Sequence, residues 1–329
     1  MGYNKENYKR IREDYATKCF RAQEEADVRR MELYASIPEL QSFDARLSNF
    51  GLRIMQAAID GENAVDRLKD LRAENERILR ERAELLVHNG FPADYSDPKY
   101  ECTQCNDTGY VGIRMCSCMR RALVEAGMQS SGMLSLLQRQ SFENFSLDYY
   151  RDGERSAVVM PQNYENLYQY AHEFSMEEGT KPPSSLLFLG GTGLGKTHLS
   201  TAIARVVIER GYDVFYNSAV GMISDFEVRR FGNGLASEGS DDTSRYIECD
   251  LLIIDDLGTE VVNQFTLSCL YYVINTRLNL TKPTIVSTNL MNADLRKNYN
   301  DRIFSRLTGD FHVVPFYGTD VRKQKIQKK

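Results

Sequence analysis

The sequence predicts an α/β fold: a doubly wound parallel sheet with helices on both faces, preceded by a mostly helical N-terminal domain. After about residue 185, short apolar runs alternate with longer amphipathic stretches, the order expected when helices connect parallel strands. Before about residue 90, apolar residues recur at spacings of three and four, the period of a helix. In a chain of 329 residues, these two patterns indicate two domains.

The composition is that of an ordinary soluble protein, with 42% hydrophobic residues, 26% charged residues and a net charge of −5. No apolar run approaches the ~18 residues of a membrane span, and the N-terminus lacks the apolar core of a signal peptide. Seven cysteines are too few for a disulfide scaffold. The expectation is a cytoplasmic protein with reduced thiols, no membrane partner and no global basic field for DNA.

Two helices are expected before residue 90. The first begins at a capping box, Ser36–Glu39, carries apolar residues on one face over Leu40–Ala58, and ends at Gly61. The second has a coiled-coil-like seam over Ala64–Leu85 that two polar residues interrupt. This seam can pack inside a helical hairpin or dock on a partner, and both readings stay open.

Four of the cysteines cluster in the pattern C-x2-C-x10-C-x-C, with a turn-forming Asn106–Gly109 segment after the first pair. Four thiolates at this spacing predict a tetrahedral zinc site. The alternative is four unconnected thiols, and His88 could substitute for one ligand. The predicted zinc ligands are Cys102, Cys105, Cys116 and Cys118.

The segment that follows is predicted to be a linker, because Ser and Gly are frequent between residues 127 and 132. A further helix is expected from about 162 to 178, ending at Gly179. Lys181–Pro183 then leads into the first strand of the sheet.

A glycine-rich run between that strand and the next helix fits the phosphate-binding pattern GxxxxGK[ST]. Its glycines allow a tight turn whose N–H groups point at phosphate oxygens, and the following helix adds its positive end. Lys196 is expected to reach the β- and γ-phosphates, and Thr197 to ligate Mg²⁺. The run consists of Gly190, Gly191, Thr192, Gly193, Leu194, Gly195, Lys196 and Thr197.

Two later apolar runs end in polar residues at the same edge of the predicted sheet. Leu251–Ile254 ends in Asp255, expected to hold Mg²⁺, and Asp256, expected to polarise the attacking water. The run beginning at Thr284 ends in Asn289, which could orient that water, although Ser-Thr-Asn after a strand is also a common turn.

These motifs are followed in order by Asp301–Leu307 and Gly318–Arg322. The series resembles an AAA+ ATPase and, more narrowly, the DnaC/DnaI-type replicative helicase loaders. The resemblance implies an arginine finger at Arg306, aided by Arg302, that reaches a neighbouring subunit's nucleotide, and a sensor arginine at Arg322. Such a finger works only in an oligomer. Spacing alone is equally consistent with a solvated pair of surface arginines.

Two features depart from the AAA+ pattern. Many AAA+ ATPases have glutamate where this chain has Asp256, and because the shorter side chain lies farther from the water, slow, switch-like hydrolysis is expected. Only seven residues follow Arg322, so a reduced helical lid is expected. The cysteine pattern itself resembles CxxCxDTGY…CxC of Gram-positive-type DnaC/DnaI relatives, which supports zinc.

Two positively charged regions are candidates for DNA contact. Arg229 and Arg230 precede a Gly-, Ser- and Asp-rich loop over 232–244 that is expected to be mobile. In helicase loaders an inserted helix here contributes to single-stranded DNA binding, but a solvent-facing helix explains the arginines equally well. Residues 295–329 carry nine Lys or Arg against three Asp, which could contact phosphates or keep a tail solvated.

The resemblance divides the chain into a helicase-interaction domain over 1–121, a linker over 122–150 and an AAA+ ATPase domain over 151–329. It implies an ATP- and Mg²⁺-dependent loader that self-associates and places the replicative helicase hexamer on single-stranded DNA during DNA replication. Two alternatives stay open. An IstB-like transposition helper shares the core motifs but usually lacks a zinc segment, and a nucleotide-sensing adaptor would hydrolyse little ATP.

Overall fold

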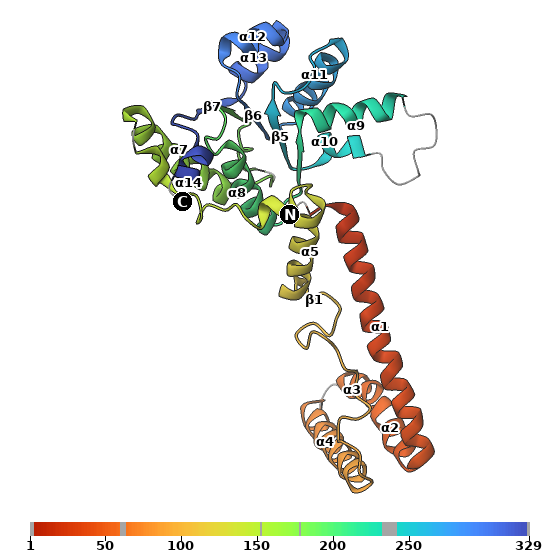
Figure 1. Ribbon diagram of the computed structural model, residues 1–329. Coiled ribbons are helices and arrows are strands. Elements are labelled where there is room, and N and C mark those ends of the chain that lie inside the picture. Colours follow the sequence, from red (N-terminus) through yellow and green to blue (C-terminus); the bar gives the residue numbers. More distant parts are fainter. Residues whose placement is uncertain (1–2, 60–63, 152, 178, 232–241, 328–329) are drawn as a thin grey trace. The chain divides into compact units, whose positions relative to one another are not determined.

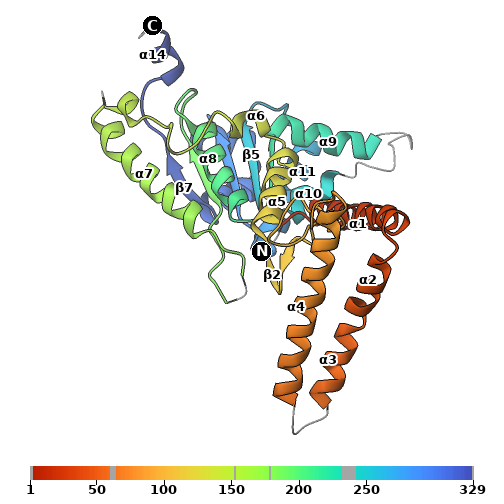
Figure 2. The same ribbon diagram turned by 90° about the horizontal axis from the view of Figure 1, so that it is seen from below.

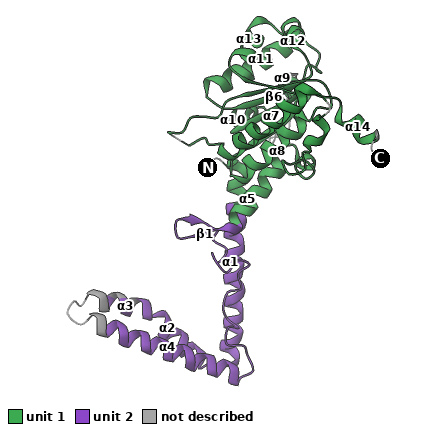
Figure 3. Ribbon diagram, turned by 90° about the vertical axis from the view of Figure 1, so that its left-hand side faces the viewer, with its two compact units in different colours: residues 1–11, 119–329 green, residues 12–118 purple. Residues whose placement is uncertain are grey.

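The structure is a computed structural model that describes residues 3–59, 64–151, 153–177, 179–231 and 242–327 (Figure 1). It forms two compact units, one of residues 1–11 and 119–329 and the other of residues 12–118 (Figure 3). Within the described residues, no helix is both long and apolar enough to cross a bilayer. Most of the predicted mobile loop over 232–244 lies outside the described residues.

The first unit is built on a five-stranded, all-parallel sheet in the order β4-β5-β6-β3-β7, which confirms the predicted fold class (Figure 2). Leu189 pairs with Thr288, and Ser218 pairs with Asp255, so the carboxyl ends of these four strands lie at the same edge of the sheet. The strands are β3 (Leu186–Leu189), β4 (Val214–Ser218), β5 (Leu251–Leu257), β6 (Thr284–Thr288) and β7 (His312–Pro315).

Helices cover both faces of this sheet because its strands alternate apolar residues between two separate cores. Leu186, Phe188 and Ile253 face one core, whereas Leu187 and Ile254 face the other. The first core is covered by α7 (Glu154–Glu173) and α8 (Lys196–Glu209). The second is covered by α9 (Ala219–Phe231), α11 (Gln264–Asn279), α12 (Asn292–Asn298) and α13 (Asp301–Gly309).

Helix α7 begins at Glu154, eight residues before the predicted start, and ends at Glu173 rather than at Gly179. Pro161, next to the predicted start, lies inside the helix. Short elements complete the unit: η3 (Asp242–Ser244), α10 (Arg245–Glu248) and α14 (Val321–Gln327).

The linker predicted over 122–150 is instead folded onto the core of the first unit. It contains most of α5 (Ser117–Ser130), α6 (Leu134–Leu137) and the 3-10 helix η2 (Leu147–Tyr150). The Ser/Gly turn that suggested a linker is docked on the edge strand, where Tyr216 N–H donates to the Ser131 carbonyl at 2.9 Å. Apolar residues after the turn are buried in the first core, namely Met133, Leu137, Phe142 and Tyr150.

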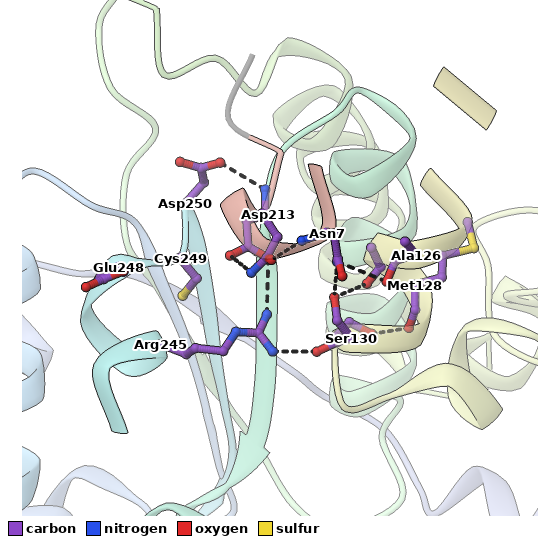
Figure 4. Close-up of polar contacts among 12 residues, drawn as sticks. Asn7, Ala126, Met128, Ser130, Asp213, Arg245, Glu248, Cys249 and Asp250 are labelled. Carbon is purple, nitrogen blue, oxygen red and sulfur yellow. Dashed lines mark hydrogen bonds and ion pairs between the residues drawn. The ribbon is translucent and has the colours of Figure 1, made fainter. Parts of the chain in front are cut away.

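The first residues of the chain also belong to this unit (Figure 4). Asn4 Nδ2 donates to the Asp213 carboxylate at 3.3 Å, and Asn7 Nδ2 donates to Ser130 Oγ at 2.8 Å. Arg245 donates to both acceptor residues, to Asp213 Oδ1 at 3.1 Å and to the Ser130 carbonyl at 2.6 Å. A polar network therefore fastens the N-terminal segment and α5 to the start of β4.

The second unit is mostly helical, as predicted, but its helix boundaries differ. Ser36 ends a helix instead of capping one, and the predicted long helix is two helices separated at Asn49. Ser48 Oγ and Asn49 Nδ2 both donate to the Ala45 carbonyl, at 2.9 and 3.1 Å, which competes with continuation of the helix. The helices are α1 (Lys5–Ser36), α2 (Leu40–Ser48), α3 (Phe50–Ile59) and α4 (Ala64–His88).

The seam of α4 packs within this unit, against α2 and α3. Arg82, predicted as a polar interruption, donates from Nε to Asp44 Oδ1 at 2.7 Å, with 11% and 19% of the two side chains exposed. Tyr34 donates to the other carboxylate oxygen at 2.7 Å. Since Ile78 and Leu86 are buried on either side of Arg82, the hairpin reading describes the seam.

Candidate functional site

A pocket of about 220 Å³ lies over the carboxyl edge of the sheet in the first unit. One side is the glycine-rich run between β3 and α8, together with Asp256 and Arg322. The other side is the folded segment before α7, and includes Gln140, Phe145 and Tyr149. The pocket therefore combines a phosphate-binding loop with a partly aromatic wall.

The loop has the backbone shape that its glycines predict. Gly193 and Gly195 have φ of 76° and 86°, in the left-handed region. A Cβ on Gly195 would lie 2.8 Å from the Phe145 ring and from the Tyr150 hydroxyl, so this position has no room for a side chain. Tyr150 donates to the Leu194 carbonyl at 2.9 Å, which ties the aromatic wall to the loop.

Lys196 is buried at 6% exposure, and its ammonium donates to the carbonyls of Gly190 and Gly191 at 2.7 and 2.8 Å. Burial lowers the pKa of Lys196, while the carboxylates of Asp256 and Asp255 oppose that shift. The charge is therefore held over the loop in a partly desolvated position, where a phosphate is its natural partner.

Asp255 is buried and receives three hydroxyl donors. Thr197 Oγ1 and Tyr216 OH donate to Oδ2 at 2.9 and 2.8 Å, and Ser287 Oγ donates to Oδ1. The predicted pair for Mg²⁺, Thr197 and Asp255, is thus already in contact. Hydroxyl and carboxylate oxygens at this spacing fit a hard cation such as Mg²⁺.

Asp256 has a different environment, although it is the next residue. Its side chain is exposed towards the pocket, and its backbone has φ of 54°, which is strained for a residue other than glycine. Its N–H donates to Ser287 Oγ at 3.0 Å. Partial burial and the neighbouring Asp255 charge raise the pKa of Asp256. The turn therefore directs the second carboxylate away from the first.

Asn289 follows β6 at the same edge and is exposed. The carbonyl of the preceding Thr288 accepts from Gly190 N–H at 3.3 Å, which places Asn289 beside the start of the loop. Asn289 thus lies at the same edge of the sheet but is not among the residues that line the pocket, and its role stays a prediction.

The predicted arginines separate into two groups. Arg322 lines the pocket, and its charge acts on both Lys196 and Asp256. Arg302 and Arg306 lie on α13 and do not line the pocket of their own chain. The Arg306 guanidinium lies 5.5 Å from the centroid of the Tyr271 ring on α11. Arg306 also lies 3.5 Å from the Asp310 carboxylate at the end of the same helix, and its role as a finger stays a prediction.

Sequence reasoning missed four residues that shape this site. Tyr216 and Ser287 hold Asp255, and Phe145 and Tyr150 pack on the loop. Ser287 lies near the end of β6, which was a usable signal, whereas Tyr216 lies in the middle of β4. The sequence offered no such signal for Phe145 and Tyr150, because the linker predicted over 122–150 placed both residues outside the domain that contains the sheet.

The four clustered cysteines are brought together in the second unit, with all four sulfurs within 4.8 Å of one another. Cys102 and Cys116 sulfurs are 3.9 Å apart, and Cys105 and Cys118 sulfurs are 3.5 Å apart. Tetrahedral zinc–thiolate bonds of ~2.3 Å require sulfurs about 3.8 Å apart. His88 is exposed and is not part of the cluster. The donor set and its size therefore fit zinc.

A turn and a hairpin shape this cluster. The Asp107 carboxylate accepts the N–H groups of Glu101 and Cys102, both at 2.8 Å, and Asp107 itself has φ of 55°. The hairpin of β1 (Tyr110–Val111) and β2 (Arg114–Met115) then returns the chain to Cys116. Backbone N–H donors at Cys105 and Gln104 lower the pKa of Cys102 to about 7, whereas burial raises the pKa of Cys105 and of Cys118.

The glycine-rich loop, the buried lysine and the hydroxyl–aspartate pair define the class as a P-loop nucleotide-binding protein. Residues 180–329 match the family model described as IstB-like ATP binding protein. Residues 180–329 are thus similar to IstB-like ATP binding proteins, and the chain is also similar to the DnaC helicase loaders, which confirms the predicted resemblance.

Three comparisons give the extent of the similarity. The replicative helicase loader DnaC of Escherichia coli strain K12 is 25% identical over 200 residues, 60% of this chain and 75% of that protein. The phage-like element PBSX protein XkdC of Bacillus subtilis strain 168 is 27% identical over 229 residues, 65% of this chain and 80% of that protein. The crystal structure of the DnaC helicase loader matches with a TM-score of 0.42 and 24% identity, over 54% of this chain and 98% of that one.

Proposed function

We propose that this protein is an ATP-dependent loader of the replicative DNA helicase onto single-stranded DNA. The observation that carries the proposal is a built nucleotide site whose predicted finger, Arg306, does not line the pocket of its own chain. Such a site is completed only when a neighbouring copy supplies the arginine, so nucleotide state and assembly are coupled. The similarity to loaders named DnaC supports the identity of the task.

In the proposed mechanism, the loop N–H groups and Lys196 bind the phosphates of ATP. Thr197 and Asp255 hold Mg²⁺, which neutralises phosphate charge when bound. Asp256 polarises the attacking water with help from Asn289, and Arg322 senses the nucleotide from the same chain. The short side chain at Asp256 supports slow hydrolysis that acts as a switch.

The unit of residues 12–118 is proposed to bind the helicase, with a structural zinc ion held by the four cysteines. Its helix α1 supports this role, because Phe20, Val28 and Met31 lie along one face and are 62%, 55% and 71% exposed. Exposed apolar residues at helical spacing are a common docking surface for a partner protein.

Contact with single-stranded DNA is proposed for the assembled oligomer and is tied to α9 and the positively charged C-terminal residues. On α9, the Arg230 guanidinium lies 5.2 Å from the centroid of the Phe265 ring, and Arg229 donates to Thr243 Oγ1 at 2.5 Å. Both arginines are exposed in spite of these contacts. The proposed loader acts in the cytoplasm.

A second candidate is a transposition helper ATPase, favoured by the family match over residues 180–329. It would use the same nucleotide site but recruit a transposase. The cysteine cluster supports the loader instead, since such helpers usually lack a zinc segment. A nucleotide-sensing adaptor with little hydrolysis is the third reading.

The experiment that tests the proposal is native mass spectrometry of the full chain mixed with the replicative helicase of its source, with and without ATP. The expected result is a discrete helicase complex that carries one zinc ion per chain of this protein. Replacing Phe20 and Met31 by Ser should weaken the helicase complex without loss of zinc. Phe226→Ser is not a matched surface control, because Phe226 on α9 is partly buried against the second core. Val158→Ser, an exposed apolar residue on α7, is the matched control. Absence of a complex in every nucleotide condition would overturn the loader assignment.

A further inference from the structure

One buried polar atom in the nucleotide pocket has no partner. Gln140 lines the pocket, and its amide oxygen Oε1 is buried without a hydrogen-bond donor among the described residues. Buried acceptors are almost always paired in folded proteins, because an unpaired one loses its bond to water without replacement. An acceptor of this kind in a ligand pocket indicates that a ligand supplies the donor.

The other polar side chains on this wall are already engaged. The Asn144 amide donates to the Arg139 carbonyl at 2.8 Å and accepts from Ser141 N–H at 3.0 Å. His198 Nε2 lies 2.9 Å from the Ser141 carbonyl. The amide of Gln140 is therefore the group best placed to read a ligand.

Its position fits the base rather than the phosphates of a nucleotide. The phosphates are bound at the glycine-rich loop, which forms the opposite side of the same pocket. The wall beside Gln140 contains Phe145, whose ring stacks at 5.6 Å on Tyr150 and at 5.9 Å on Tyr164. Packed aromatic rings next to a lone amide are suited to a flat heterocycle with polar edges.

A glutamine amide pairs better with adenine than with guanine. Adenine presents an N6 donor next to a ring-nitrogen acceptor, which matches the acceptor and donor of the amide. Guanine presents O6 and N7, two acceptors, on the corresponding edge. On this N7 edge, the amide can therefore make two hydrogen bonds to adenine, whereas O6 and N7 of guanine or hypoxanthine leave the amide oxygen without a donor.

We infer that Gln140 is the residue that makes this pocket select adenine nucleotides over nucleotides with a carbonyl at purine C6. This inference rests on the proposed nucleotide-driven function and adds the residue that sets its specificity. The amide oxygen accepts the exocyclic N6–H of the base, and no covalent step is involved.

The test is isothermal titration of the full chain with ATP and with ITP, which differ at purine C6 and its neighbouring N1 proton. The wild-type chain should bind ATP at least about tenfold more tightly than ITP, the loss expected for a mispaired buried acceptor, equal to ~1.4 kcal/mol. Gln140→Met keeps the length of the side chain and should reduce the preference to within about twofold. Gln138→Met, at an exposed residue two positions earlier, should leave it unchanged.

A second variant covers the case in which Gln140→Met does not fold. Gln140→Arg replaces the acceptor by donors and should shift the preference towards ITP. Equal binding of ATP and ITP by the wild-type chain would overturn the inference while leaving the proposed function intact. Failure to bind any nucleotide would contradict both.

Discussion

Asp255 and Asp256 are adjacent residues with opposite surroundings. Three hydroxyl groups converge on Asp255, whereas Asp256 turns out of the sheet through a left-handed backbone conformation and faces the pocket. This divergence lets one carboxylate stay fixed beside Thr197 while the next meets solvent and substrate. The strained turn thus separates the carboxylate proposed to bind metal from the one proposed to activate water.

The Asp256→Asn variant should bind ATP with little change in affinity and lose at least about a hundredfold in hydrolysis rate, because the amide cannot polarise water as a carboxylate does. The measurement is ATP turnover beside equilibrium ATP binding. Asp294→Asn, at an exposed residue on α12, is the control. Unchanged turnover in Asp256→Asn would show that another group activates the water.

The pH dependence of the wild-type rate should reflect two opposite pKa shifts. Burial and the Asp255 charge raise the pKa of Asp256, so the active carboxylate is lost, as pH falls, at a higher pH than an ordinary aspartate near ~3.9. Burial lowers the pKa of Lys196, so its charge is lost, as pH rises, at a lower pH than an ordinary lysine near ~10.4. In a plot of kcat/KM against pH, the range of full activity should therefore be narrower, at both its acid and its alkaline end, than the range set by an ordinary aspartate and an ordinary lysine. An apparent pKa at or below ~3.9 on the acid side would contradict the role of Asp256.

Tyr299 links the loop after β5 to the helix that carries Arg306. Its hydroxyl donates to buried Glu260, whose other oxygen accepts Gly258 N–H at 2.8 Å, and the next residue, Asn300, caps α13. Tyr299→Phe should lower the free energy of unfolding by about 1–3 kcal/mol, because it leaves the buried carboxylate short of a donor. Urea denaturation measures this loss, with the exposed Tyr272→Phe as the matched control; equal stability of the two variants would refute the link.

Among the helices and strands, the sequence predicted those strands whose local pattern of apolar and polar residues matches their position in the sheet. The β3, β5 and β6 strands are apolar runs followed by polar residues, so they and the loop after β3 were identified from sequence. The segment over 122–150 was not, because its Ser/Gly turn has the composition of a linker and only contact with β4 makes it part of the core. Gln140 and Phe145 lie in this segment, so the sequence analysis did not identify them as residues of the nucleotide pocket.

The cysteine cluster was likewise predictable only where it depends on local sequence. Spacing predicted the four ligands, but the Asp107 carboxylate that shapes the turn and the Tyr15 hydroxyl that bonds to Cys118 depend on the folded chain. Tyr15 lies on α1, more than a hundred positions from its partner in the sequence. Local spacing carries no information on such a contact.

The hairpin of β1 and β2 is short, so its stability is expected to depend on the metal. Cys105→Ser should reduce zinc to well below one ion per chain and abolish protection of residues 101–118 from hydrogen exchange. Metal analysis and exchange mass spectrometry measure the two effects. Cys19→Ser, which changes a cysteine outside the cluster, should alter neither. Full zinc content in the Cys105 variant would exclude this cysteine as a ligand.

At the scale of the whole molecule, the separation of Arg306 from the pocket predicts that one chain alone is an incomplete enzyme. Arg306→Ala should retain ATP binding and lose about a thousandfold in hydrolysis. Lys196→Ala should lose nucleotide binding. A mixture of the two inactive variants should regain part of the activity, because a chain with intact Lys196 receives Arg306 from its neighbour. Lys297→Ala, an exposed charge on α12, is the control. No recovery on mixing would contradict a finger acting in trans.

We propose that ATP binding at this pocket drives transfer of a helicase to single-stranded DNA. The most direct measurement is the amount of replicative helicase bound to circular single-stranded DNA after incubation with the full chain and ATP. The wild-type chain should increase this amount severalfold over helicase alone, and Lys196→Ala should abolish the increase. Equal loading by the wild-type and Lys196→Ala chains, or no loading by either, would contradict it.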